Sequence, residues 1–154
     1  MRRIPMAVFA ALLSMCLPLS LARAADSAPA SVPADPQYAQ AVAAIKAHQY
    51  DKAIPMLQAY ARRSPPDADV HNLLGYAYRK TGKLEPAFDH YKQALALDPK
   101  HRAAHEYIGE AYLMANNLPK AEEHLKILDG LCTLSCEEYR DLKKAVADYK
   151  ARSR

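Results

Sequence analysis

Residues 73–87 read LLGYAYRKTGKLEPA, and residues 107–121, which begin 34 positions later, read YIGEAYLMANNLPKA. The two stretches carry the same residue types at corresponding places: Gly75 and Gly109, Tyr78 and Tyr112, and Ala87 and Ala121. A weaker copy lies 34 positions earlier, where Ala53 corresponds to Ala87. Self-similarity at such a period is typical of a solenoid built from stacked units. We therefore expect three repeats, at 34–67, 68–101 and 102–135.

Each repeat has the length and the pattern of two helices joined by a tight turn. Apolar residues recur at spacings of three and four, without the alternation that strands require. Gly82 and Asn116 fall in the turns, where a residue with positive φ can end the first helix. We expect the small residues of the first helices to meet those of the second helices: Ala41 with Ala53, Gly75 with Ala87, and Gly109 with Ala121.

This pattern resembles the tetratricopeptide repeat family. The residues that carry the resemblance are Leu74, Gly75, Tyr78, Ala87, Tyr91, Ala94 and Pro99 in the second repeat, and Ile108, Gly109, Tyr112, Ala121 and Leu125 in the third. The first repeat departs from the pattern, with Gln40 in the place of Leu74 and Ala44 in the place of Tyr78. The resemblance implies an all-α fold, a right-handed superhelix of three antiparallel helix pairs over residues 37–135.

A further helix is expected over residues 136–150. Ser135, followed three residues later by Glu138, has the pattern of a capping box that begins a helix. One apolar stripe runs along the segment and consists of Tyr139, Leu142, Val146 and Tyr149. We expect this helix to cover the apolar end of the last repeat, as a solenoid requires.

The N-terminus has the pattern of a secretory signal peptide. Arg2 and Arg3 precede an uncharged apolar run, and ARA at 22–24 offers small residues for cleavage. We expect residues 1–24 to be removed, residues 25–36 to form a flexible leader, and the protein to be periplasmic or secreted. The full chain has a net charge of +4, but loss of three basic residues leaves 18 basic against 17 acidic residues. This balance gives no argument for nucleic acid as a partner.

Nothing in the sequence predicts catalysis or a cofactor. The chain lacks a phosphate-binding loop, a nucleophile elbow and an HExxH zinc motif. His101 and His105 are four residues apart, but no third ligand accompanies them, so we expect no metal site there. From their repeat positions, we expect His105 and His71 to be packing residues and His90 and His124 to face solvent.

Cys132 and Cys136 remain after removal of the signal peptide. In the oxidising compartment that export implies, the pair favours a structural disulfide between the third repeat and the last helix. Two alternatives stay open at this point, a free or redox-active pair and a metal site. The second hypothesis for function is therefore a redox- or metal-handling accessory protein that uses Cys132 and Cys136.

The resemblance also implies a concave groove, lined by the first helix of each pair, in which partners bind. By helical position we place these residues in the groove: Tyr38, Val42, Ile45, Lys46, Asn72, Tyr76, Arg79, Lys80, Glu106, Glu110 and Leu113. We expect a non-catalytic adaptor of the cell envelope that binds a protein or peptide there, with Arg79 and Lys80 pairing with acidic groups. The protein is expected to be a monomer or part of an envelope complex, without stable membrane insertion after signal cleavage.

Overall fold

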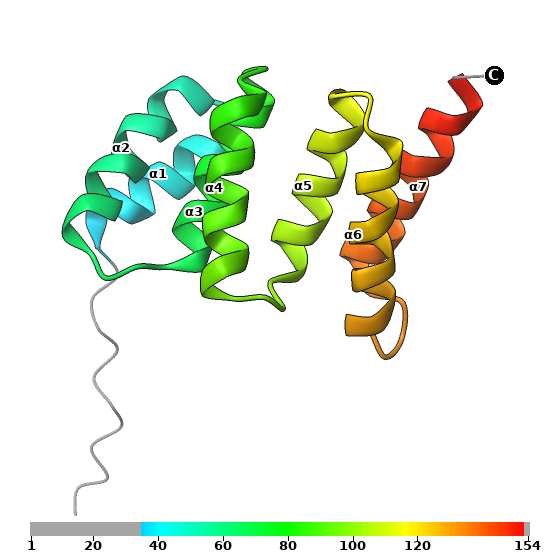
Figure 1. The fold of residues 1–154 in the computed structure, drawn as a ribbon. Coiled ribbons are helices and arrows are strands. Elements are labelled where there is room, and N and C mark those ends of the chain that lie inside the picture. Colours follow the sequence, from blue (N-terminus) through cyan, green and yellow to red (C-terminus); the bar gives the residue numbers. More distant parts are fainter. Residues whose placement is uncertain (1–34, 153–154) are drawn as a thin grey trace, which may run out of the picture. The chain divides into compact units, whose positions relative to one another are not determined.

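The computed structural model describes residues 35–152, and this part of the chain is entirely helical apart from turns and loops (Figure 1). The helices are α1 (Pro36–Lys46), α2 (Tyr50–Arg63), α3 (Ala68–Lys80), α4 (Leu84–Leu97), α5 (Arg102–Met114), α6 (Leu118–Leu131) and α7 (Glu137–Arg152). They form three antiparallel pairs, α1 with α2, α3 with α4 and α5 with α6, followed by α7. The predicted all-α solenoid of helix pairs is confirmed.

The two helices of each pair are joined by a turn that contains one residue with positive φ. These residues are His48 (φ 57°), Gly82 (φ 76°) and Asn116 (φ 56°), and they are spaced 34 apart. Gly82 and Asn116 confirm the prediction, because glycine adopts this conformation without steric cost and asparagine tolerates it. His48 completes the series with a residue type that is also enriched in this region. The same backbone turn thus recurs in all three pairs with three different side chains.

The first helix of each pair begins with a side chain that accepts backbone hydrogen bonds. Asp35 and Asp67 each accept bonds from two N–H groups in the first turns of α1 and α3. His101 takes this place before α5, where its Nδ1 accepts from the N–H of Ala104 at 3.1 Å and its Nε2 lies 2.9 Å from Asp69 Oδ1. These caps satisfy donors that would otherwise lack a partner at the helix start.

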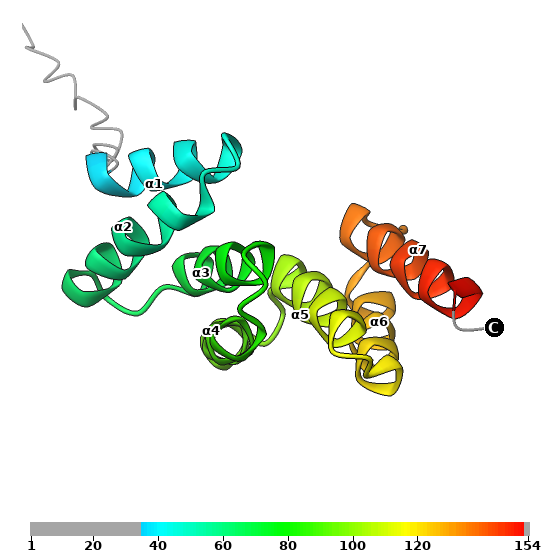
Figure 2. The same cartoon turned by 90° about the horizontal axis from the view of Figure 1, so that it is seen from above.

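Figure 2 shows α1, α3, α5 and α7 along one side of the described chain and α2, α4 and α6 along the other. Within each pair the two helices pack against each other, and successive pairs meet through α2 with α3 and α4 with α5. α7 packs against both α5 and α6. It therefore occupies the place in which the first helix of a fourth pair would lie.

Three hydrophobic clusters make up the core of the described helices. The first spans α1, α2 and α3, the second spans α4 and α5 with a contribution from α3, and the third spans α5, α6 and α7. Their largest buried members are Leu57 and Leu74 in the first, Tyr91 and Ile108 in the second, and Leu128 and Leu142 in the third. Tyr78 packs against the first and second clusters, and Tyr112 against the second and third. These two tyrosines, 34 residues apart, connect the core from end to end.

Gly75 and Gly109 allow close approach of neighbouring helices, and the side chains nearest to them are large apolar residues. A Cβ atom added at Gly75 would lie 2.6 Å from two ring carbons of Tyr91. A Cβ atom added at Gly109 would lie 2.6 Å from Cδ2 of Leu142. The absent side chain therefore makes room for a large apolar residue of α4 in one case and of α7 in the other.

The start of α7 differs slightly from the prediction. The helix begins at Glu137, so Cys136 precedes it and Ser135 lies one residue too far away for the predicted capping box. The backbone oxygen of Ser135 instead accepts a hydrogen bond from Nη1 of Arg140 at 2.6 Å. The predicted apolar stripe is confirmed, because Leu142 and its neighbours on that stripe pack in the third cluster.

The predicted signal peptide, residues 1–24, lies outside the described residues, as does most of the predicted leader. The exceptions are Asp35 and Pro36, which we assigned to the leader: Asp35 caps α1, and Pro36 is the first residue of that helix. Among the helices between residues 35 and 152, none is both long and apolar enough to cross a bilayer.

Candidate functional site

The first helices of the three pairs, α1, α3 and α5, lie on the side of the fold that also carries α7 (Figure 2). Residues 34 apart on these helices occupy equivalent places along this side. We define the inner face as Tyr38 and Val42 of α1, Asn72, Tyr76 and Arg79 of α3, and Glu106 and Glu110 of α5. Two other predicted residues, Lys46 and Lys80, are exposed at the C-terminal ends of α1 and α3.

Arg79 lies at the centre of the inner face and is buried, with 6% of its surface exposed. Its Nη1 is 2.6 Å from Oε2 of Glu110, and its Nε donates to the hydroxyl of Tyr91 at 3.3 Å. The ring centroids of Tyr76 and Tyr107 each lie 5.4 Å from its Cζ. One carboxylate, one hydroxyl and two aromatic rings thus surround the guanidinium, which is a favourable setting for a buried cation.

These contacts change the role that the sequence suggested for Arg79. We expected its guanidinium to meet an acidic group of a partner, whereas Glu110 of the same chain supplies that group. Arg79 therefore organises the inner face by joining α3 to α5. Lys80, the other predicted basic contact, is exposed, and its Nζ lies 5.4 Å from the ring centroid of Tyr76.

Asn72 and Glu106 are buried polar side chains with oxygen atoms that have no protein partner. Asn72 is 6% exposed, and its Oδ1 is buried without a hydrogen bond among the described residues. Glu106, at the equivalent place of the next repeat, is 8% exposed and makes no hydrogen bond or ion pair within the described helices. Burial, followed by the charges of Glu110, Asp141 and Glu138, raises the pKa of Glu106 to about 8.

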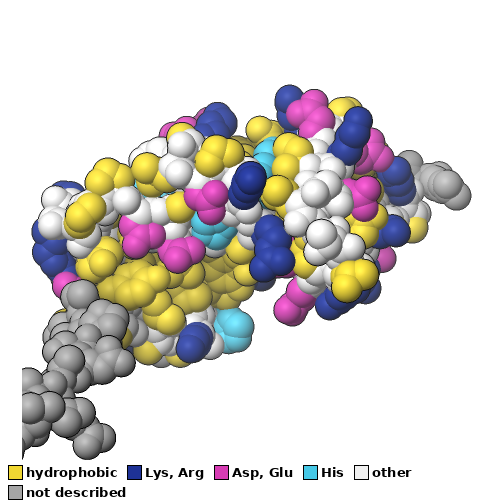
Figure 3. All heavy atoms as spheres, turned by 90° about the horizontal axis from the view of Figure 1, so that it is seen from below, with side chains coloured by type: hydrophobic (Ala, Val, Ile, Leu, Met, Phe, Trp, Pro, Cys, Tyr) yellow, Lys and Arg dark blue, Asp and Glu magenta, His cyan; other side chains and the backbone are white. Residues whose placement is uncertain are grey.

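The inner face changes in character from α1 towards α7. At α1 it is aromatic and aliphatic, with Tyr38 packed on Tyr60 at a ring distance of 5.1 Å and Val42 partly exposed. Tyr76 and Tyr107 continue the aromatic surface at 4.9 Å, and the carboxylates of α5 and α7 follow. Figure 3 shows hydrophobic side chains gathered over the N-terminal half of the described helices and charged side chains spread over the C-terminal half.

Two recesses border the inner face, and both include residues of α7. The first measures about 320 Å³ and is lined by Arg79, Glu110, Leu113, Met114, Ala145, Asp148, Tyr149 and Arg152. The second measures about 210 Å³ and is lined by Ala103, Glu106, Tyr107, Glu137, Glu138 and Asp141. The sequence predicted α7 only as a capping helix, so its contribution to the two recesses was missed. α7 does not follow the repeat pattern that identified the residues of α3 and α5.

The repeated histidines form two pairs that the sequence did not predict. Nδ1 of His71 lies 3.1 Å from Nδ1 of His90, and Nδ1 of His105 lies 2.9 Å from Nδ1 of His124. The expectation that His90 and His124 face solvent is wrong, because both rings are half-buried and stack on a tyrosine of the first helix. Burial, followed by the neighbouring His105, lowers the pKa of His124 to about 4.

His101 and His105, the pair considered as metal ligands, are both held by protein groups. His101 caps α5 and contacts Asp69, and the Nε2 of His105 lies 3.0 Å from the carbonyl oxygen of Pro99. Between residues 35 and 152 there is no group of three or more His, Cys, Asp or Glu side chains arranged to hold a metal ion.

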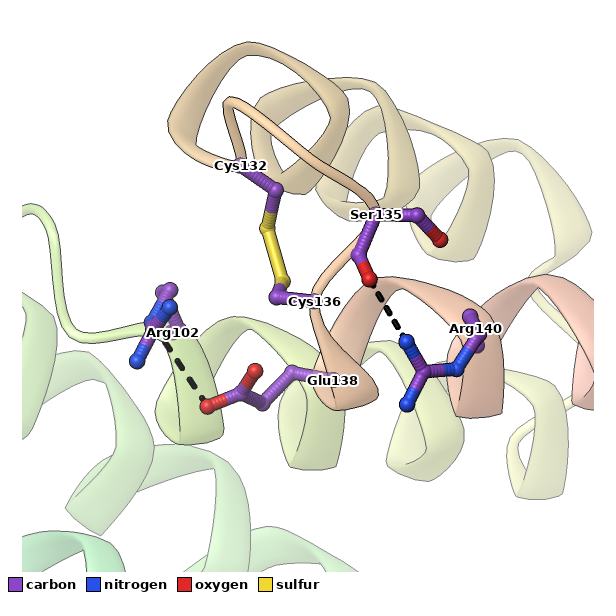
Figure 4. The surroundings of a disulfide bond; sticks show 6 residues. All are labelled: Arg102, Cys132, Ser135, Cys136, Glu138 and Arg140. Carbon is purple, nitrogen blue, oxygen red and sulfur yellow. Dashed lines mark hydrogen bonds and ion pairs between the residues drawn. A yellow bond between two sulfur atoms is a disulfide. The ribbon is translucent and has the colours of Figure 1, made fainter.

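Cys132 and Cys136 form the predicted disulfide (Figure 4). Their Cα atoms are 5.6 Å apart, within the usual range for a disulfide. The bond joins the end of α6 to the start of α7, and Leu134 in the short loop between them is 91% exposed. The cysteines are a staple at the α6–α7 junction and do not belong to the inner face.

Comparisons with known proteins agree with this architecture. Two tetratricopeptide repeat models match the chain, one over residues 38–100 and the other over residues 81–146. Cellulose synthase operon protein C of Escherichia coli (strain K12) is 34% identical over 106 residues, which make up 58% of this chain. The chain spans 9% of the length of that relative.

Two solved structures illustrate the shared fold. Residues 41 to the end of MamA from Desulfovibrio magneticus RS-1 match with a TM-score of 0.60 and 29% identity, over 62% of this chain and 54% of that one. The type III secretion chaperone SycD of Yersinia enterocolitica, in complex with a peptide of the translocator YopD, matches with a TM-score of 0.66 and 19% identity, over 77% and 92%. The helix pairs, the repeated core residues and the two matching repeat models agree, and the chain belongs to the tetratricopeptide repeat family.

Proposed function

We propose that this protein is a non-catalytic adaptor that binds an extended or helical segment of a protein partner on its inner face. The observation that carries the proposal is the row of partly exposed apolar and aromatic side chains on α1 and α3, Tyr38, Val42 and Tyr76. These side chains would bury apolar groups of the segment, since rigid aromatic surfaces are common anchors of binding. The recesses against α7 extend the same surface.

The peptide complex of SycD supports this assignment by analogy. SycD has the same fold and is described with a peptide of YopD bound to it. A shared fold does not fix a shared partner, so the analogy supports binding of a segment and not the identity of that segment.

We further propose that the adaptor works in the cell envelope, in the periplasm or after secretion. The signal-peptide pattern of residues 1–24 supports export. The disulfide between Cys132 and Cys136 agrees with an oxidising compartment.

Site-specific photo-crosslinking in the native cell tests the inner face. A benzophenone amino acid at position 42 should form a crosslinked product with a partner, because Val42 lies on the inner face and is partly exposed. The matched control carries the same amino acid at position 92, because Lys92 is exposed on α4, on the opposite side (Figure 2). Mass spectrometry of the product identifies the partner.

Val42→Glu and Lys92→Glu then separate binding from a general effect of charge. Val42→Glu places a charge in the apolar part of the inner face and should weaken binding of the identified partner at least about tenfold. Lys92→Glu should leave binding unchanged, and circular dichroism checks that both variants are folded. Equal crosslinking from positions 42 and 92 would refute the proposed face.

A further inference from the structure

The recess between the start of α5 and the start of α7 has a carboxylate-rich lining. Glu106, Glu137, Glu138 and Asp141 contribute acidic groups, and Ala103 and Tyr107 complete the wall. Among the described residues, one of these acids forms an ion pair. Nε of Arg102 lies 3.6 Å from Oε1 of Glu138 at an exposed edge (Figure 4). The recess therefore carries an excess of negative charge that the protein itself leaves largely uncompensated.

Glu106 distinguishes this recess from an ordinary acidic surface. Its side chain belongs to a residue that is 92% buried, it borders the recess, and no hydrogen bond or ion pair of the described chain satisfies it. Buried carboxylates are normally hydrogen-bonded or paired, because loss of hydration is otherwise uncompensated. Glu110, one helical turn away, shows the usual arrangement with its partner Arg79. The carboxylate of Glu106 therefore borders the recess without a partner from the described chain, and it can meet a group from outside.

The charges around Glu106 favour a positive group. Glu110 of α5 and Glu138 and Asp141 of α7 all raise the pKa of Glu106, and Arg79 of α3 opposes them less strongly. A cation in the recess would relieve this repulsion and release the proton that Glu106 holds near neutral pH.

The shape and lining favour an organic cation over a metal ion. The acidic groups of the described chain are not arranged in a set of three or more that could hold a metal. Tyr107 contributes an aromatic side chain to the wall, and aromatic rings attract guanidinium and ammonium groups. A guanidinium can also bond a carboxylate through two parallel N–H groups.

From this geometry we infer that the recess binds an arginine or lysine side chain of the partner segment. The inference rests on the proposed function and adds chemistry to it. The segment would place apolar side chains on Tyr38, Val42 and Tyr76 and a basic side chain beside Glu106. The inner face thereby fixes the direction in which the segment lies, from apolar at α1 to basic at α7.

Titration of the full chain with N-acetyl-arginine amide tests the recess without knowledge of the partner. We expect saturable NMR shifts of the Ala103 methyl group and of the Tyr107 ring, because both border the recess. N-acetyl-citrulline amide, which is similar in shape but uncharged, should produce no saturable shift. Between pH 6 and pH 9 the affinity for the arginine probe should rise several-fold, as Glu106 loses its proton.

Glu106→Gln is the decisive variant, and Glu85→Gln is its matched control. Glu106→Gln should weaken binding of the arginine probe at least about fivefold and abolish the rise with pH. Glu85 is exposed on α4, away from the recess, so its substitution should change neither. Retention of the wild-type affinity by Glu106→Gln, or equal shifts with the citrulline probe, would overturn the inference.

The outcomes for the recess and for the adaptor role can be told apart. Crosslinks from position 42 without binding of the arginine probe would overturn the cation site and leave the adaptor standing. Binding of the arginine probe without crosslinks from position 42 would support the recess and count against the adaptor.

Discussion

The Nδ1 atoms of His105 and His124 lie 2.9 Å apart, so one imidazole donates a hydrogen bond to the other. Nε2 of His105 lies 3.0 Å from the carbonyl oxygen of Pro99, and this contact requires a hydrogen on Nε2. In the neutral pair His105 therefore accepts through Nδ1, and His124 donates. His71 and His90 repeat the arrangement in the preceding pair of helices at 3.1 Å. Protonation of both rings of a pair would place two positive charges in contact.

Acid should destabilise the protein through His124. The pKa of this residue falls from an ordinary 6.5 to about 4. Burial lowers it most, followed by His105; Lys120 lowers it further, and Glu123 opposes the change. A depressed histidine pKa contributes stability that is present above pH 6.5 and lost as the pH falls towards 4. Since the ring is partly open to solvent, the loss should be about 1–2 kcal/mol.

Urea unfolding at pH 7.5 and pH 4.5 measures this effect. His124→Phe keeps an aromatic ring against Tyr112 and removes the titration, so its stability should fall less with acid than that of the wild type. His48→Asn is the control, because it removes an exposed histidine at a turn whose positive φ asparagine tolerates. Equal pH dependence in His124→Phe and the wild type would contradict the prediction.

Alkali should destabilise the protein through Glu106. The pKa of this carboxyl rises from an ordinary 4.5 to about 8, chiefly because of burial. Its contribution to stability is therefore fully present below pH 4.5 and is lost as the pH rises through 8. Glu106→Gln should resemble the wild type at pH 5 and be more stable by about 1–2 kcal/mol at pH 9, after allowance for solvent in the recess. Thermal unfolding at the two pH values shows the difference, and an equal change in both proteins would refute it.

The glycines of the helices offer a matched test of packing. Gly109→Ala should destabilise the protein by about 1–3 kcal/mol, because its Cβ would meet Leu142 of α7 at 2.6 Å. Gly130→Ala should be neutral or stabilising by up to about 1 kcal/mol, since nothing outside its own stretch of helix lies within 4 Å of an added Cβ and alanine favours the helix. Chemical denaturation of both variants checks the prediction, which fails if the two changes have the same effect.

Arg79 should be more important for stability than for direct contact with a partner. Arg79→Met removes the guanidinium from Glu110 and from the hydroxyl of Tyr91, and we expect a loss of about 2–4 kcal/mol. Glu110→Gln in the same background should restore part of this loss, because it removes the carboxylate left without a counter-charge. Denaturation of the two single variants and the double variant measures the coupling. Additive losses would show that the pair is not coupled.

The disulfide should contribute modestly to stability. Replacement of Cys132 and Cys136 by alanine opens a very short loop, and such a loop gains about 2 kcal/mol or less from closure. We expect the variant to stay folded, because the cysteines lie at the α6–α7 junction, outside the three clusters. Alkylation without reductant, followed by intact mass, should modify neither cysteine in exported wild-type protein. Two modified thiols would favour the redox-active alternative.

The repeat period predicted those features that themselves repeat along the backbone. Gly82 and Asn116 marked the turns correctly, and Tyr78 and Tyr112 marked the residues that join the clusters. The turn of the first repeat was harder to predict, because histidine is a weaker indicator of positive φ than glycine or asparagine. Backbone conformation and burial could thus be predicted where a suitable residue type occurred at the same position of successive repeats.

The polar contacts of the inner face could not be predicted in the same way. Arg79 and Glu110 come from different repeats, and neither has a counterpart of the same type 34 residues away. Glu138 and Asp141 belong to α7, whose sequence shows an apolar stripe but no repeat position from which its polar side could be placed. The histidine pairs could have been predicted from the sequence, because both members of each pair recur after 34 residues. Placing the four rings on helices that face each other would have predicted the contacts.

The boundaries of the three hydrophobic clusters do not coincide with the boundaries of the sequence repeats. Each cluster includes residues from three successive helices, whereas each sequence repeat contains two helices. A cut after residue 101, where the second sequence repeat ends, would divide the cluster that holds Tyr91 and Ile108. A cut after α3 would instead fall between the buried residues of the first cluster and those of the second. Truncation and repeat insertion in this protein should therefore be planned around triplets of helices, with Tyr78 and Tyr112 as the joints between them.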